Sequence, residues 1–313
     1  MYFVDGCSQQ EVAAALETSR SNVSRMLAAA RRQGIVEIRI IDSARRRPDL
    51  EAELRQRFGL TDCQVAAYEA GTSPAHGVAK LASMWLLDAA KERQRIALSW
   101  GTALQAMVWE TTASRHYDVE VVQLVGGLSP VDASVSGQEL VRELATRLGA
   151  RYRYLHAPAL VTSEAAMNAF LGERSVATAL DAAKAADIAM VGIGTYGDSS
   201  SAAIIDAMSL EPAERAAFDQ LAPAGDICAR YFDIDGVPIG FKTVHERVLA
   251  VDLGDLHRIP TVVGVTSGRV KAPGLLGALR GRYLDVLVCD ESAARAVLAL
   301  DTAHPAAKGE MAP

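Results

Sequence analysis

The sequence predicts an α/β protein in which an N-terminal, winged helix-turn-helix precedes a larger, doubly wound, Rossmann-like domain. Three observations predict this fold class. Residues 8–40 have the order helix, short turn, basic helix and strand, which is the order of a winged helix-turn-helix. A run of arginines that ends at Pro48 interrupts the hydrophobic periodicity. Beyond it, strand-like and helix-like segments alternate, as they do in a parallel sheet with helices on both faces.

Composition limits the classes of protein to which the chain can belong. Its 313 residues carry a formal net charge of −6, and 50% are hydrophobic and 22% charged, as in an ordinary globular protein. No apolar stretch reaches the roughly 20 residues that span a bilayer, and no secretion signal opens the chain, so we expect a cytoplasmic protein. Cys7, Cys63, Cys228 and Cys289 form no Cys-x-x-Cys pair. They predict buried thiols and neither a metal site nor a disulfide framework.

The chain divides at the arginine run. We expect a DNA-binding domain over residues 1–41, a linker over 42–48 and a second domain over 49–313. The first helix is expected to begin after Ser8, whose side chain can cap it, while Glu11 stands at the spacing of a capping box.

The second helix, in the run SRSNVSRMLAAARRQG, has an apolar side and a basic side. Helical phase places Val23, Met26, Leu27 and Ala30 together. The opposite side holds short or basic residues, namely Ser21, Ser24, Arg25, Ala28 and Arg32. Gly34 is expected to end the helix, and residues 35–40 alternate as a strand does.

The basic side has the chemistry of a surface that reads DNA. Arginine can form bidentate bonds to guanine, and serine or asparagine can bond bases or phosphates. The expected contact residues are Gln9, Arg20, Ser21, Asn22, Ser24, Arg25 and Arg32. A solvated amphipathic helix is the alternative interpretation. Residues 1–40 hold five Lys and Arg against four Asp and Glu, so useful affinity for operator DNA requires several copies of the domain.

The second domain is expected to form a doubly wound sheet. Strands are predicted within residues 63–68, 95–100, 119–127, 151–158, 187–194, 248–253, 261–268 and 283–290. Helices are predicted around residues 75–90, 103–115, 138–148, 164–184, 271–280 and 291–300.

Several predicted strands end in glycine. These residues include Gly101 before Thr102, the pair Gly126 and Gly127, and Gly194. Loop amides and helix N-termini converge at the carboxyl ends of parallel strands, so these glycines indicate an anion or ligand site. Simple turn chemistry is the alternative at each of them. The run GIGTYG lacks a well-placed acidic residue for a ribose, which argues against a dinucleotide site and leaves no cofactor expected.

Three polar side chains complete the candidate ligand site. Lys271 stands at the entrance to a helix, where its ammonium and the helix dipole act on an anion in the same direction. Asp226 can accept hydrogen bonds from ligand hydroxyls, and Gln138 can donate or accept. The alternatives are a solvated surface lysine, an aspartate that caps a turn and a glutamine that opens a helix.

The chain resembles the SorC-type, DeoR-like sugar-responsive transcriptional regulators over nearly its whole length. The resemblance rests on the N-terminal run GCSQQEVAAALETSRSNVSRMLAAARRQGIVEIRI and on SWGTAL, VVQLVGGL, DIAMVGIG, GDICARYFDIDG and VVGVTSGRVKAPGLLGALRGRYLDVLVCDE. It implies a second domain with the fold of ribose-phosphate isomerase and CoA transferase. That domain would bind a sugar phosphate, or a free sugar or polyol, without catalysis, and the effector would change the operator affinity of a homotetramer.

The resemblance also assigns residues. Gly101 and Thr102 match the phosphate-contacting loop of the family, and Gln138, Asp226 and Lys271 match its effector-contacting positions. Ala103 stands where many members have a second threonine, which leaves the phosphorylation of the effector open. The family also has a helix before the first one predicted here. Either the start lies too far downstream or the DNA-binding domain is destabilised.

An enzyme is the alternative function, because the implied fold also serves sugar-phosphate isomerases and deaminases. Such an enzyme needs a placed general acid and base. His156, His245 and His257 are scattered among ordinary segments. The sequence therefore favours a regulator without catalytic residues.

Overall fold

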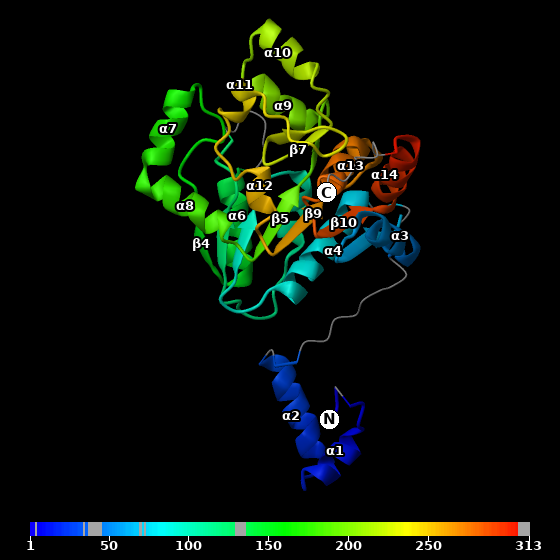
Figure 1. Ribbon diagram of the computed structural model, residues 1–313. Helices are drawn as coiled ribbons and strands as arrows, with labels where there is room; N and C mark the ends of the chain where they lie inside the picture. Colours follow the sequence, from blue (N-terminus) through cyan, green and yellow to red (C-terminus); the bar gives the residue numbers. More distant parts are fainter. Residues whose placement is uncertain are drawn as a thin grey trace, which may run out of the picture. The chain divides into compact units, whose positions relative to one another are not determined.

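The computed structural model describes residues 1–3, 5–33, 35–36, 46–68, 71, 73–128 and 136–305. The chain forms two compact units, Met1–Asp42 and Ser43–Pro313 (Figure 1). Each unit is described by itself below.

The first unit contains two helices, α1 (Gln9–Ala15) and α2 (Arg20–Arg32). Ser8 caps α1 as predicted, because the Glu11 amide donates to Ser8 Oγ at 3.2 Å and the Ser8 amide donates to Glu11 Oε2 at 2.7 Å. Ser19 caps α2 by accepting a hydrogen bond from the Asn22 amide. The turn between the helices places Glu17 in the left-handed region, with φ of 48°.

The core of this unit is small. It consists of Val12, Ala13 and Val23, with Leu27 and other partly buried residues against it. Met26, which we expected on the buried side of α2, is 52% exposed, because the contacts of α2 with α1 centre on Val23. Gly34 and the strand predicted after it fall outside the described residues, apart from residues 35 and 36, which form a bend.

A seven-stranded parallel sheet is the centre of the second unit. Its strands are β1 (Asp62–Ala66), β2 (Arg95–Leu98), β3 (Glu120–Gln123), β4 (Arg151–Arg153), β5 (Ile188–Gly192), β9 (Thr261–Val265) and β10 (Val286–Asp290). The order is β1-β10-β9-β5-β2-β3-β4. The chain winds outward from β2 to β4 and then returns to the other side of β2 at β5. This reversal is the switch point of a doubly wound sheet.

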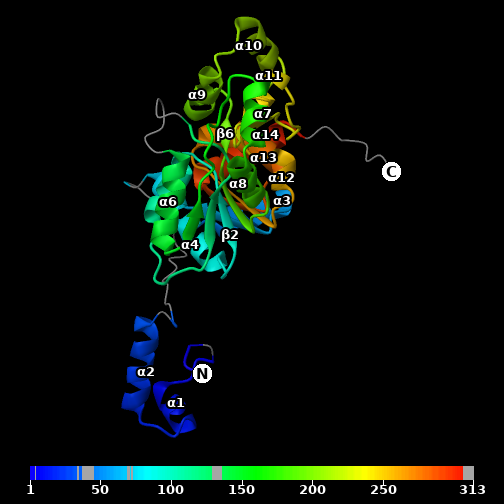
Figure 2. The same cartoon turned by 90° about the vertical axis from the view of Figure 1, so that its left-hand side faces the viewer.

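Helices cover both faces of the sheet (Figure 2). One face carries α4 (Pro74–Ala89), α5 (Thr102–Glu110) and α6 (Gly137–Leu148), and the other carries α3 (Pro48–Phe58), α8 (Arg174–Lys184), α13 (Ala272–Arg280) and α14 (Glu291–Ala303). Successive strand residues supply opposite faces: Ile96 and Leu98 pack with α4, α5 and α6, whereas Ala97 packs on the other side. Both faces are buried, which explains the apolar strands.

A smaller antiparallel sheet stands beyond the carboxyl ends of the parallel strands. It consists of β6 (Gly194–Thr195), β7 (Gly225–Ile227) and β8 (Arg230–Phe232). Residues of α9 (Ser199–Ala207), α10 (Pro212–Asp219) and α11 (Lys242–His245) pack with Tyr231 of β8, and the 3₁₀ turn η2 (Arg269–Lys271) contacts β6. Two further short helices are α7 (Glu164–Gly172), which packs with α8, and α12 (Leu253–Leu256). In Figure 1, α9, α10 and α11 group at one end of this unit.

Several predicted elements differ from the structure. The strand predicted over residues 248–253 is wrong, because the segment makes only isolated bridges such as Val125 to Ala250. The guanidinium of Arg230 donates to carbonyl oxygens of this segment, those of Val248 at 3.0 Å and Ala250 at 3.3 Å. The Leu249 amide donates to Ala159 and the Val251 amide donates to Leu124, in two different segments, so no regular ladder forms with either.

The helix boundaries also shift. The helix expected over residues 103–115 ends at Glu110, and the one expected over residues 164–184 is interrupted at Glu173, whose ψ of 122° is extended. Helix α3 begins at Pro48, the residue at which the predicted linker ends. Of the four predicted buried thiols, Cys63, Cys228 and Cys289 are buried and Cys7 is half-buried.

Candidate functional site

Helix α2 presents the predicted DNA-reading surface. Val23 is buried on one side of the helix, and five of the predicted contact residues are exposed. These five are Arg20, Ser21, Ser24, Arg25 and Arg32. Arg31 and Arg32 stand in the last turn of the helix. The geometry therefore offers short and cationic side chains on one accessible helix face, which is the arrangement that base and phosphate contacts require.

Two other predicted DNA contacts are less accessible. Asn22 is half-buried, and its Nδ2 donates to Thr18 Oγ1 at 2.9 Å. Gln9, also half-buried, is the first residue of α1. In this structure Asn22 thus stabilises the turn before α2.

Gly101 and Thr102 stand at the switch point of the large sheet. Gly101 precedes α5 with φ of 127°, a conformation that favours glycine, and Thr102 opens the helix with an exposed side chain. The ends of β2 and β5 approach closely here, because a Cβ at residue 192 would lie 2.9 Å from the Trp100 carbonyl oxygen. The N-terminus of α5 therefore points its amides beyond the carboxyl edge of the sheet.

The structure brings Gly194 and Asp226 together as direct partners in β6 and β7. Asp226 is buried, and Ser201 Oγ donates to its Oδ1 at 2.8 Å. Burial raises the pKa of the Asp226 carboxyl, although the hydrogen bonds and the charge of Lys271 oppose this shift.

The second oxygen of Asp226 holds the hairpin between β7 and β8. The Ala229 amide donates to Oδ2 at 3.1 Å. Cys228 and Ala229 both have positive φ, 54° and 59°, as the two central residues of a type I′ turn do. Asp226 therefore caps a turn, one of the two roles that the sequence left open.

Lys271 ends the 3₁₀ turn that leads into α13. Its carbonyl accepts a hydrogen bond from Thr195 Oγ1 at 3.2 Å, and the same hydroxyl oxygen accepts one from the Gly274 amide at 3.3 Å. Its Nζ donates to Asp198 Oδ2 at 2.5 Å. Lys271 is thus not a solvated surface lysine but half of an ion pair.

Gln138, Gly126 and Gly127 stand farther along the same edge. Gln138 Nε2 donates to the Leu155 carbonyl at 3.5 Å, and its side chain packs near Gly127. A Cβ at Gly126 would lie 2.4 Å from the Pro158 carbonyl oxygen, so this glycine is required for close approach of two backbone segments.

Sequence reasoning missed four polar residues at this edge. They are Gln123, Thr195, Asp198 and Ser201. Asp198 precedes a run of serines, which is a helix-start signal, but the other three carry no local signal. Gln123 is 2% exposed, and its Nε2 has no hydrogen-bond partner among the described residues.

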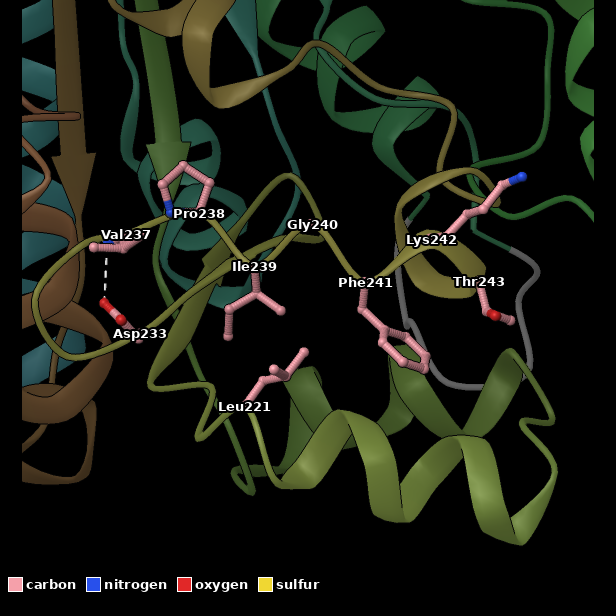
Figure 3. Close-up of a pocket in the computed structure, with 9 residues that line it drawn as sticks. All are labelled: Leu221, Asp233, Val237, Pro238, Ile239, Gly240, Phe241, Lys242 and Thr243. Atoms are coloured by element: carbon pink, nitrogen blue, oxygen red, sulfur yellow. Dashed lines mark hydrogen bonds between the residues drawn. The ribbon is translucent and has the colours of Figure 1, made fainter.

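An open groove of about 540 Å³ lies elsewhere in the second unit (Figure 3). Its lining residues are Leu221, Asp233, Val237, Pro238, Ile239, Gly240, Phe241, Lys242 and Thr243. The Asp233 side chain accepts a hydrogen bond from the Val237 amide at 2.8 Å, which closes the turn over residues 233–237. None of the predicted ligand residues lines this groove, so it is separate from the edge described above.

Over the described ranges, no cluster of three or more His, Cys, Asp or Glu side chains could hold a metal ion. The described helices also include none that is long and apolar enough to cross a membrane.

The fold and this edge define a doubly wound ligand-binding domain, preceded by a separate unit with a helix-turn-helix. The family model described as "Putative sugar-binding domain" matches residues 43–299, and the chain belongs to this family. The match covers the parallel sheet and the small antiparallel sheet together.

Comparison with whole proteins extends over both units. The chain is 28% identical over 302 residues to the deoxyribonucleoside regulator of Bacillus subtilis (strain 168), with 95% of each chain covered. It is 29% identical over 303 residues to the transcriptional regulator LsrR of Klebsiella pneumoniae, covering 96% of this chain and 90% of that one. The crystal structure of the full-length sorbitol operon regulator SorC from Klebsiella pneumoniae superposes with a TM-score of 0.74, at 28% identity, covering 95% of this chain and 96% of that one. These findings confirm the resemblance to SorC-type regulators.

Proposed function

We propose that this chain is a transcriptional regulator of a carbohydrate-related operon. The first unit binds operator DNA through α2, and the second unit binds a ligand of the sugar class that changes operator affinity. One observation carries the proposal: an exposed face of serine and arginine on α2 and a sugar-binding family domain occur in one chain. Such a regulator acts in the cytoplasm, where the operator DNA is.

The ligand site in this proposal lies at the carboxyl edge of the large sheet. Gly101 and Thr102 supply the N-terminus of α5, and Lys271 supplies a cation next to the buried Asp226. The remainder of the proposed site is formed by Gly126, Gly127, Gln138 and Gly194. The second unit binds this ligand without converting it, and a turnover assay against sugar phosphates tests that part of the proposal.

The ligand acts on DNA binding only if it has different affinities for the DNA-competent and DNA-incompetent states. Coupling of this kind is typically about 1–3 kcal/mol. The proposed assembly is a homotetramer, a dimer of dimers, because one small DNA-binding unit offers few phosphate contacts.

Titration of the full-length protein against the DNA upstream of its own gene tests the proposal. Arg25→Ala is expected to weaken binding by about 1–3 kcal/mol if Arg25 contacts a base in a bidentate manner. Arg151→Ala is the matched control, because this arginine is 75% exposed on β4 in the other unit. Equal loss in both variants, or none in either, would contradict the assignment of α2.

A further inference from the structure

The ion pair between Lys271 and Asp198 joins two elements that flank the candidate ligand site. Lys271 stands before α13, and Asp198 is the N-cap residue of α9. Their Nζ and Oδ2 atoms are 2.5 Å apart, and the Lys271 side chain is 18% exposed. The contact is therefore charge-assisted and partly shielded from water, which strengthens it relative to a surface pair.

The charges around Lys271 leave little positive potential for an anion. Asp198 contacts the ammonium directly, and Asp226 is near enough for Lys271 to stabilise its ionised form. Arg230, the buried cation of the neighbouring hairpin, donates to backbone carbonyl oxygens and pairs with Asp252 at 2.9 Å. A dianionic phosphate at Lys271 would have to displace one carboxylate and then remain close to it.

We propose that Asp198 is a specificity-determining residue that occupies Lys271 and disfavours phosphorylated ligands, so the site binds an uncharged, polyhydroxylated sugar or polyol. Hydroxyl groups suit a paired carboxylate and ammonium, since they donate to the first and accept from the second. This inference rests on the proposed function, because it specifies the ligand class of the same site.

Two substitutions remove the charge of Asp198. Although Asp198 is the N-cap residue of α9, its side chain makes no capping hydrogen bond. Asp198→Asn removes the negative charge with little change in shape, and Asp198→Ser offers a good N-cap residue as a second variant if the first fails to fold. Asp206→Asn is the matched control, because Asp206 lies on the same helix, is 69% exposed and pairs with Arg215 at 3.0 Å.

Calorimetric titration of the full-length protein with inorganic phosphate tests the proposal. Asp198→Asn and Asp198→Ser are expected to bind phosphate about tenfold more tightly than the wild type, because the carboxylate that repels phosphate and pairs with Lys271 is gone. The control variant Asp206→Asn should bind as the wild type does. The double variant Asp198→Asn, Lys271→Met should lose the whole gain.

Three results would overturn the proposal. The first is a gain in phosphate affinity below about twofold in both Asp198 variants, which is smaller than a direct charge contact requires. The second is a gain that persists in the double variant without Lys271. The third is an equal gain in Asp206→Asn, which would show that the effect is not specific to Asp198. Because this titration contains no DNA, it is independent of the regulator proposal. Failure to bind upstream DNA would refute that proposal and leave the phosphate result standing.

Discussion

Gly194 lies opposite Asp226 across β6 and β7, so closely that a Cβ at residue 194 would be 1.9 Å from Asp226 Oδ1. No side chain fits beside this buried carboxyl group without displacing it. The pair is therefore a structural requirement of the small sheet as well as part of the candidate ligand edge.

Gly194→Ala is expected to lower the free energy of unfolding by about 1–3 kcal/mol, because the added methyl group must push Asp226 out of place. Denaturant titration measures this change. Gly172→Ala is the control, since a Cβ at that helical glycine has no neighbour within 4 Å and should be neutral or slightly stabilising. Equal effects in the two variants would refute the steric argument.

The buried Asp226 should make stability depend on pH. Its pKa is raised above 3.8 by burial, so the folded protein holds this proton more tightly than the unfolded chain. The contribution of Asp226 to the free energy of unfolding is therefore present at low pH, and it is lost as the pH rises through the pKa of the folded state. Asp226→Asn removes the titration, so the unfolding free energy of the wild type minus that of the variant should fall with rising pH. A difference that is constant with pH would show that Asp226 does not titrate in this way.

Arg230 is expected to stabilise the conformation of the segment from His245 to Asp252. It is 8% exposed, donates to four of the segment's carbonyl oxygens and pairs with Asp252. Arg230→Met leaves these groups without their donor and should cost about 3–5 kcal/mol of unfolding free energy. Arg295→Met removes an exposed arginine whose partner Glu291 keeps its pair with Arg47, and it should cost no more than about 0.5 kcal/mol. Calorimetric melting of both variants distinguishes these outcomes.

Arg32 lies at the end of α2, where a phosphate contact is expected. Arg32→Ala should weaken binding to specific and unrelated DNA alike, and it should reduce the salt dependence of log K by about 1. Anisotropy titrations at several salt concentrations give this slope. An unchanged slope would place Arg32 outside the interface.

The proposed assembly predicts at least a dimer in solution, because two half-sites are needed for useful affinity. Sedimentation velocity at micromolar concentration, with and without DNA, measures it. A monomer under both conditions would contradict the proposed mode of binding.

Features that depend on neighbouring residues could be predicted from the sequence. Ser8 and Glu11 form the predicted capping box, since their contact spans a single helical turn. The alternation of apolar strands and helices predicted the parallel sheet, because strands buried on both faces must be apolar. The same alternation identified the carboxyl edge at Gly101 and Thr102.

Contacts between distant residues could not be predicted from the sequence and became visible only in the folded chain. Lys271 and Asp198 are 73 residues apart in the chain, and nothing local in either segment specifies their pairing. The short strands β7 and β8 carry too few residues to show a period. Gly126 follows a predicted strand, as a glycine of a ligand-binding loop does, but its backbone packs against that of Pro158. Burial, close backbone approach and ion pairing depend on where the sheet places remote segments. Local sequence patterns report helix and strand periodicity and carry no information on these contacts.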